Sequence, residues 1–123
     1  MNLKTYKILF ILWSIVILTL TSIPKLKTPV DEPFNIDKIA HFVVYIIFAY
    51  LFIKMHLKKN LIKTLKVLWI LAIIVPIFDE LHQIPIPGRQ FSFWDIIADF
   101  LGFLAILLFF TYRKKPKTRR NKS

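Results

Sequence analysis

The chain has 123 residues, 56% of them hydrophobic, and carries a formal net charge of +11 at pH 7. Its mean hydropathy is +0.57, and its apolar residues come in unbroken blocks, whereas soluble helices keep one polar face. These features exclude an ordinary soluble domain and predict an integral membrane protein. The absence of cysteine excludes disulfides and thiolate metal sites.

Four apolar blocks approach the length that a helix needs to cross a hydrocarbon core of about 30 Å. They span residues 8–23, 39–57, 61–78 and 94–112. We therefore predict an all-α bundle of about four transmembrane helices, a single membrane domain over residues 1–123 that crosses the cell membrane several times. Two alternatives stay open. The first block could be a signal peptide, although no small-x-small cleavage site follows it, and the second and third blocks could form a re-entrant hairpin.

The basic residues are distributed unevenly along the chain. Of 18 Lys and Arg, 14 lie at the amino end, around the connection between the second and third blocks, or in the tail at 113–123. All seven Asp and Glu lie in or beside the other two connections. Because cytoplasmic segments are enriched in Lys and Arg, this distribution predicts that both termini are cytoplasmic. Contact with anionic lipid explains the basic tail, so we predict no nucleic-acid partner.

Polar residues collect at the ends of three blocks that this orientation places outside the cytoplasm. The three groups are Asp37, Lys38, His41 and Tyr45; Asp79, Glu80, His82 and Gln83; and Arg89, Ser92, Asp95 and Asp99. Charged groups at membrane depth are costly unless they face a partner or a cavity. Packing of the three blocks is therefore expected to gather these residues into one polar pocket at the extracytoplasmic ends. The alternative is that they form ion pairs that only fix helix packing.

Few kinds of chemistry fit this pocket. Paired carboxylates can act as general acid and base, which makes Glu80 and Asp95 candidate catalytic residues, although no recognised catalytic motif is present. Ser92 lacks the glycine-framed turn of a nucleophilic serine. No His-x-x-x-His or His-Glu-x-x-His spacing occurs, so we predict neither a metal site nor a cofactor. Arg89 and Lys38 together are suited to hold a phosphate or a carboxylate.

Short polar motifs occur in a fixed order between the apolar blocks. They are Asp37-Lys38-Ile39-Ala40-His41-Phe42 followed by Tyr45, then Asp79-Glu80-Leu81-His82-Gln83, Pro87-Gly88-Arg89 and Ser92-Phe93-Trp94-Asp95. As a set, over residues 35–105, they resemble the VanZ-like family of small bacterial membrane proteins, whose namesake is associated with resistance to the glycopeptide teicoplanin. The chain departs from the family pattern at Asp99, where Asn is common, and at Ile106, where glycine is common.

The resemblance implies a set of ligand-binding positions, to which the pocket adds Asp99. Together they are Asp37, Lys38, His41, Tyr45, Glu80, Gln83, Arg89, Ser92, Asp95 and Asp99. The expected function is recognition or modification of a lipid-linked envelope molecule at the outer leaflet, linked to teicoplanin tolerance. The expected partner is a membrane lipid or a lipid-linked cell-wall precursor, and formation of a homo-oligomer stays open.

Two other functions remain as alternatives. One is a membrane enzyme that acts on an anionic lipid through Glu80 and Asp95. The other is an ion or proton pathway through Asp99, which the apolar cytoplasmic halves of the second and fourth blocks disfavour.

Overall fold

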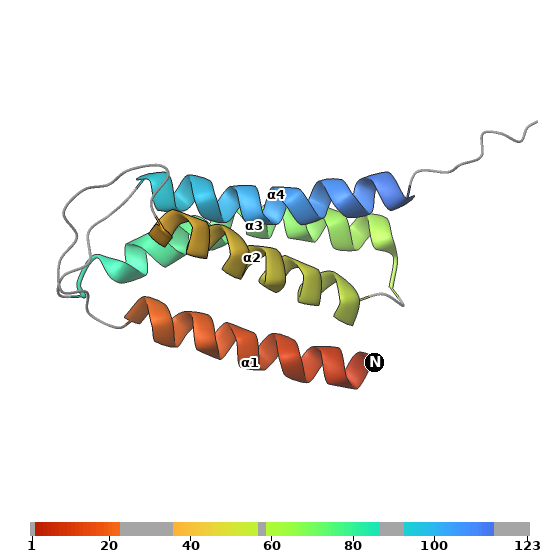
Figure 1. Cartoon of the computed structure of the whole chain (residues 1–123). Coiled ribbons are helices and arrows are strands. Elements are labelled where there is room, and N and C mark those ends of the chain that lie inside the picture. The colour runs from red at the N-terminus through yellow and green to blue at the C-terminus, as the bar shows by residue number, and fades with distance from the viewer. Residues whose placement is uncertain (1, 23–35, 57–58, 87–92, 115–123) are drawn as a thin grey trace, which may run out of the picture.

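The computed structural model of the chain describes residues 2–22, 36–56, 59–86 and 93–114. These residues form four helices and no strand: α1 (Leu3–Ser22), α2 (Ile36–Met55), α3 (Leu61–Gln83) and α4 (Phe93–Lys114). Successive helices run in opposite directions, so the start of α1 and the end of α4 lie at the same end of the bundle (Figure 1). Each helix contains a segment long and apolar enough to cross a membrane. The prediction of an all-α bundle with four spans is confirmed.

The helix ends differ from the predicted ends of the apolar blocks. α1 begins at Leu3, before the predicted start at residue 8, and so includes Lys4 and Lys7. α3 continues past residue 78 to Gln83. Charged residues end an apolar block but do not end a helix, and lysine stems can lie along a helix while the ammonium group reaches the membrane surface. α2 and α3 are continuous helices of 20 and 23 residues, which argues against a re-entrant hairpin.

The core of the bundle lies among α2, α3 and α4. Residues without exposed surface occur on all three helices: Ala49, Ile53, Leu68, Ala72, Phe103 and Leu107. The ring of Tyr45 stacks on that of Phe103, with 5.4 Å between the ring centroids. The core therefore combines two alanines, where helices can approach closely, with larger aliphatic side chains and aromatic rings.

Gly102 allows α4 to lie directly against α2. A Cβ atom at this position would be 2.6 Å from the carbonyl oxygen of Phe42 and 3.1 Å from the Cβ of Tyr45. The first distance is too short for a real contact with backbone, so this helix pair requires glycine here. The close approach also brings the start of α2 next to the start of α4.

The helix α1 lies at the edge of the bundle, alongside α2 (Figure 1). Its buried residues are Ile17 and Thr21. The indole N–H of Trp13 donates a hydrogen bond to the carbonyl oxygen of Val44 at 3.0 Å, which joins the middle of α1 to α2. Eight of the remaining α1 side chains are large, apolar and exposed, as expected for a helix that faces lipid.

The end of α3 turns away from α4 and toward α1, in teal in Figure 1. Pro76 lies inside α3, and proline removes one backbone hydrogen bond and permits a bend. Beyond it, His82 Nε2 and Ser22 Oγ share a hydrogen bond of 2.9 Å, which joins the ends of α3 and α1. Asp79 and Glu80 lie between the proline and this contact.

Gly102→Ala is expected to lower the free energy of unfolding by about 1–3 kcal/mol, because the added methyl group forces α4 away from α2. Thermal unfolding in detergent, followed by circular dichroism, measures the change. Leu108→Ala on the exposed side of α4 is the control and should have a small effect, since that side chain is 48% exposed. Equal effects of the two substitutions would contradict the close packing at Gly102.

The predicted orientation can be tested by labelling, because the chain contains no cysteine. Ile84→Cys, just beyond α3, should react with a membrane-impermeant maleimide in intact cells. Lys59→Cys, between α2 and α3, should react only after the membrane is permeabilised. The reverse pattern would show that the termini lie outside the cytoplasm.

Candidate functional site

Buried polar side chains gather at one end of the core, contributed by α2, α3 and α4. Seven of them, each 0–8% exposed, are Lys38, His41, Asp79, Glu80, Gln83, Asp95 and Asp99. We refer to these residues as the polar cluster. They lie toward the helix ends that the distribution of basic residues predicts to be extracytoplasmic.

Lys38 of α2 pairs with Asp95 in the first turn of α4. The distance from Lys38 Nζ to Asp95 Oδ1 is 2.8 Å, and the two side chains are 8% and 6% exposed. The other carboxylate oxygen of Asp95 lies 3.5 Å from His41 Nε2. Asp95 therefore bridges two positions that are almost one helical turn apart on α2, which fixes the register between α2 and α4.

His41 lies between two carboxylates of α4. Its Nδ1 atom is 2.6 Å from Asp99 Oδ1, in a buried hydrogen bond. Asp95 and Asp99 are four residues apart and therefore share one face of α4. A carboxylate at each nitrogen of the imidazole therefore fixes the orientation of the His41 ring.

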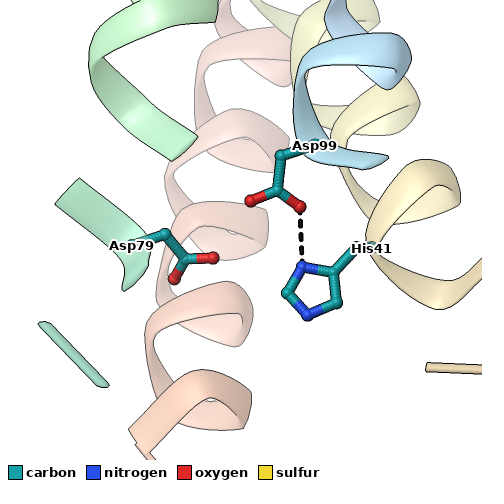
Figure 2. Close-up of side chains that lie close together, drawn as sticks. All are labelled: His41, Asp79 and Asp99. Carbon is teal, nitrogen blue, oxygen red and sulfur yellow. Dashed lines mark hydrogen bonds and ion pairs between the residues drawn. The ribbon is translucent and has the colours of Figure 1, made fainter. Parts of the chain in front are cut away.

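Asp79, on α3, lies close to His41 and Asp99. Its carboxylate points toward His41 and Asp99, as Figure 2 shows. Gln83 Nε2 donates a hydrogen bond to Asp79 Oδ1 at 3.4 Å, from one turn further along the helix. Asp79, His41 and Asp99 each offer one possible metal-ligating atom, and these atoms all lie within 4.8 Å of one another. Three helices thus meet at this point through polar side chains.

Two apolar cavities lie beside the polar cluster, along α1. The first has a volume of about 120 Å³ and is lined by Ile17, Leu20, Thr21, Ala40, His41, Val44 and Tyr45. The second has a volume of about 190 Å³ and is lined by Ser14, Ile17, Leu18, Tyr45, Phe48, Val75, Phe78, Asp79 and His82. Each cavity thus has mainly apolar walls and a few polar groups that belong to the cluster or lie next to it.

Most of the predicted ligand-binding side chains meet in this region. The structure places six of them at the buried ends of α2, α3 and α4, and Tyr45 in the middle of α2; the six are Lys38, His41, Glu80, Gln83, Asp95 and Asp99. The side chain of Asp37, and Arg89 and Ser92, lie outside the described residues. The assignment of all ten as ligand-binding residues stays a prediction.

The sequence analysis did not include Asp79 among the ligand-binding residues. Its position one turn before Gln83 was the available signal, because residues four apart share a helix face. The structure shows the two side chains in contact, with Asp79 5% exposed. Asp79 therefore belongs to the same buried surface of α3 as Gln83.

Comparison with known proteins gives one match. A family model described as VanZ/LLP1 matches residues 2–114. No curated protein and no solved structure matches the chain. The matched region includes all four helices and the whole polar cluster.

Removal of one member of the Lys38–Asp95 pair should destabilise the bundle more than removal of both. Lys38→Met takes away the ammonium group and leaves the buried carboxylate of Asp95 without it, at an expected cost of about 3–5 kcal/mol. Lys38→Met combined with Asp95→Asn should recover much of this loss. Thermal unfolding of the single and double variants in detergent measures the coupling, and strictly additive effects would contradict a buried ion pair.

Proposed function

The chain belongs to the VanZ/LLP1 family, and from this premise we propose that it recognises a lipid-linked molecule of the bacterial cell envelope from within the cell membrane. The observation that carries the proposal is the contact between an apolar cavity along α1 and the buried polar cluster. A membrane-anchored ligand needs both parts, since its chain requires apolar walls and its headgroup requires polar partners.

The position of α1 supports entry of a lipid chain from the bilayer. Leu18 and Phe78 line the larger cavity and are 50% and 59% exposed, so the cavity borders the surface that faces lipid. Asp79 and His82 line the same cavity. A chain lying between α1 and α3 would place its headgroup at these polar side chains.

The chemistry of the polar cluster favours a headgroup rich in hydrogen-bond donors. Four of its members are carboxylic acids, and its lysine already pairs with Asp95. Carboxylates accept hydrogen bonds from hydroxyl, amide and ammonium groups, which are the groups of sugars and peptides. A lipid-linked cell-wall precursor carries such groups, and we predict from the sequence that Arg89 binds its phosphates.

The proposed link to teicoplanin follows from the same site. Teicoplanin and the precursor both carry lipid tails and concentrate in the membrane. A protein that binds either one at the outer leaflet can change how often the two meet. The proposal therefore includes tolerance that is selective for the lipid-tailed glycopeptide.

A membrane enzyme that acts on the same lipid is the second candidate. The hydrogen bond of 2.6 Å between His41 and Asp99 favours it, because a buried carboxylate can orient an imidazole for general base catalysis. In the enzyme hypothesis, Glu80 is a second general acid or base. Asp95 is a weaker candidate for that role, because it forms an ion pair with Lys38. Glu80→Gln would then abolish turnover and leave lipid binding intact.

A proton or ion pathway has less support. Among the described residues, the core beyond Asp99 toward the opposite end of the bundle is mainly apolar: Ala49, Ile53, Phe103 and Leu107 are fully buried, and Thr64 of α3 is a buried polar side chain near that end. A pathway across the membrane requires polar groups or water along its length.

Teicoplanin susceptibility of a strain that lacks the protein tests the proposal. Complementation with wild type should raise the inhibitory concentration of teicoplanin and leave that of vancomycin unchanged. Glu80→Gln and Arg89→Ala should fail to do so, because each alters a group proposed to hold the ligand. Ile73→Ala, whose side chain is 57% exposed on α3, is the matched control and should protect like wild type.

Expression of each variant has to be matched by immunoblot. Unchanged tolerance in the wild-type complement would refute the link to teicoplanin. Full protection by both Glu80→Gln and Arg89→Ala would show that these side chains are not part of the functional site.

A further inference from the structure

We propose that His41, Asp79 and Asp99 form a binding site for a divalent transition-metal ion such as Zn²⁺. One ligand atom from each residue lies within 4.8 Å of the other two. Figure 2 shows the imidazole and the two carboxylates around a common point, with each residue on a different helix. The sequence analysis predicted no metal, because ligands that come from three helices leave no characteristic spacing along the chain.

Two carboxylate oxygens in this triad are available to bind a cation. Asp79 Oδ2 and Asp99 Oδ2 have no hydrogen-bond partner among the described residues. Asp79 is 5% exposed and Asp99 is fully buried. A buried carboxylate inside a membrane-spanning bundle requires a partner of positive charge, a proton or a metal. A cation held by both carboxylates meets this requirement for both oxygens at once.

The charge of the polar cluster gives a second argument. Its described members include four carboxylic acids and one lysine. Lys38 lies 2.8 Å from Asp95. Asp95 is near the Nε2 atom of His41, whereas Asp99 is near the Nδ1 atom on the other side of the ring. Asp79 and Asp99 thus lack a lysine of their own within the cluster. A divalent ion at the triad balances these two carboxylates, and it also makes the cluster able to attract an anionic group.

The ligand set indicates the kind of metal. One imidazole nitrogen with two carboxylate oxygens suits zinc, manganese and iron better than the all-oxygen sites of calcium or magnesium. Three protein ligands leave at least one coordination position for a further group, as in catalytic zinc sites. Metal–ligand bonds of about 2.0–2.2 Å bring ligand atoms within about 4 Å of one another, so small rotations of the aspartate side chains are sufficient.

The hydrogen bond between His41 and Asp99 holds two of the ligands together. An ion that binds here displaces the proton of this bond, as metal binding to protonated ligands requires. His41 lines one of the cavities along α1 and Asp79 lines the other. A ligand oxygen in either cavity could therefore reach the open coordination position, and the ion would polarise it as a Lewis acid.

Zinc binding by the full chain tests the site. The protein is purified in detergent without a polyhistidine tag, stripped with EDTA, incubated with Zn²⁺ and freed of excess ion. Wild type should retain about one zinc per chain by atomic emission, and His41→Gln, Asp79→Asn and Asp99→Asn should each lose it. His56→Gln is the matched control and should keep it, because this histidine lies just beyond the opposite end of α2 and contacts the Phe52 carbonyl oxygen.

Co²⁺ replaces Zn²⁺ in a second measurement on wild type alone, which does not depend on the folding of the variants. Visible absorption bands of Co²⁺ bound to nitrogen and oxygen ligands are expected. Folded wild type that retains no zinc and gives no such bands would overturn the proposal, and so would wild-type zinc content in all three variants. The zinc assay contains no lipid, so it can succeed or fail independently of the proposed lipid recognition.

Discussion

Four carboxyl groups, those of Asp79, Glu80, Asp95 and Asp99, are buried among helices long enough to cross a membrane. An ionised carboxylate at that depth costs several kcal/mol unless a partner offsets the loss of water. The contacts of α2 with α4 meet this constraint. Lys38 pairs with Asp95, and His41 lies between Asp95 and Asp99. Gly102, three residues after Asp99, lets the two helices approach closely enough for these contacts to form.

The packing of the other helices follows from this central pair. α3 adds Asp79 and Glu80 to the same buried end, after a proline that permits its last turns to lean toward α1. α1 contributes few buried residues and leaves cavities between itself and the core. The bundle thus combines a three-helix core, which holds the polar cluster, with a peripheral helix that borders apolar cavities. This division is the physical basis for proposing that a membrane-anchored ligand reaches the cluster sideways from the bilayer.

The sequence was sufficient to predict the four spans, because long apolar blocks leave few alternatives in a membrane. It also indicated that polar residues of three blocks lie close together, since each group lies at the corresponding end of its block, and most of the described members of the three groups are buried at one end of the core. The specific partners were not predictable. Helical spacing relates residues on one helix only, so the pairing of Lys38 with Asp95 and the meeting of Asp79 with His41 and Asp99 required the tertiary structure. The late end of α3 was also missed, because a charged residue interrupts hydropathy but not the helix.

The central claim is that the cavity along α1 and the polar cluster together form a site for a lipid-linked envelope molecule. A photo-crosslinking amino acid at Leu18, which lines the larger cavity, tests it most directly when it is compared with the same substitution at Leu12, an exposed position on α1. After irradiation of intact cells, mass spectrometry identifies the attached lipids. We expect a lipid-linked envelope molecule to be enriched at Leu18 and bulk phospholipid at Leu12. The same phospholipid adducts at both positions would contradict the claim.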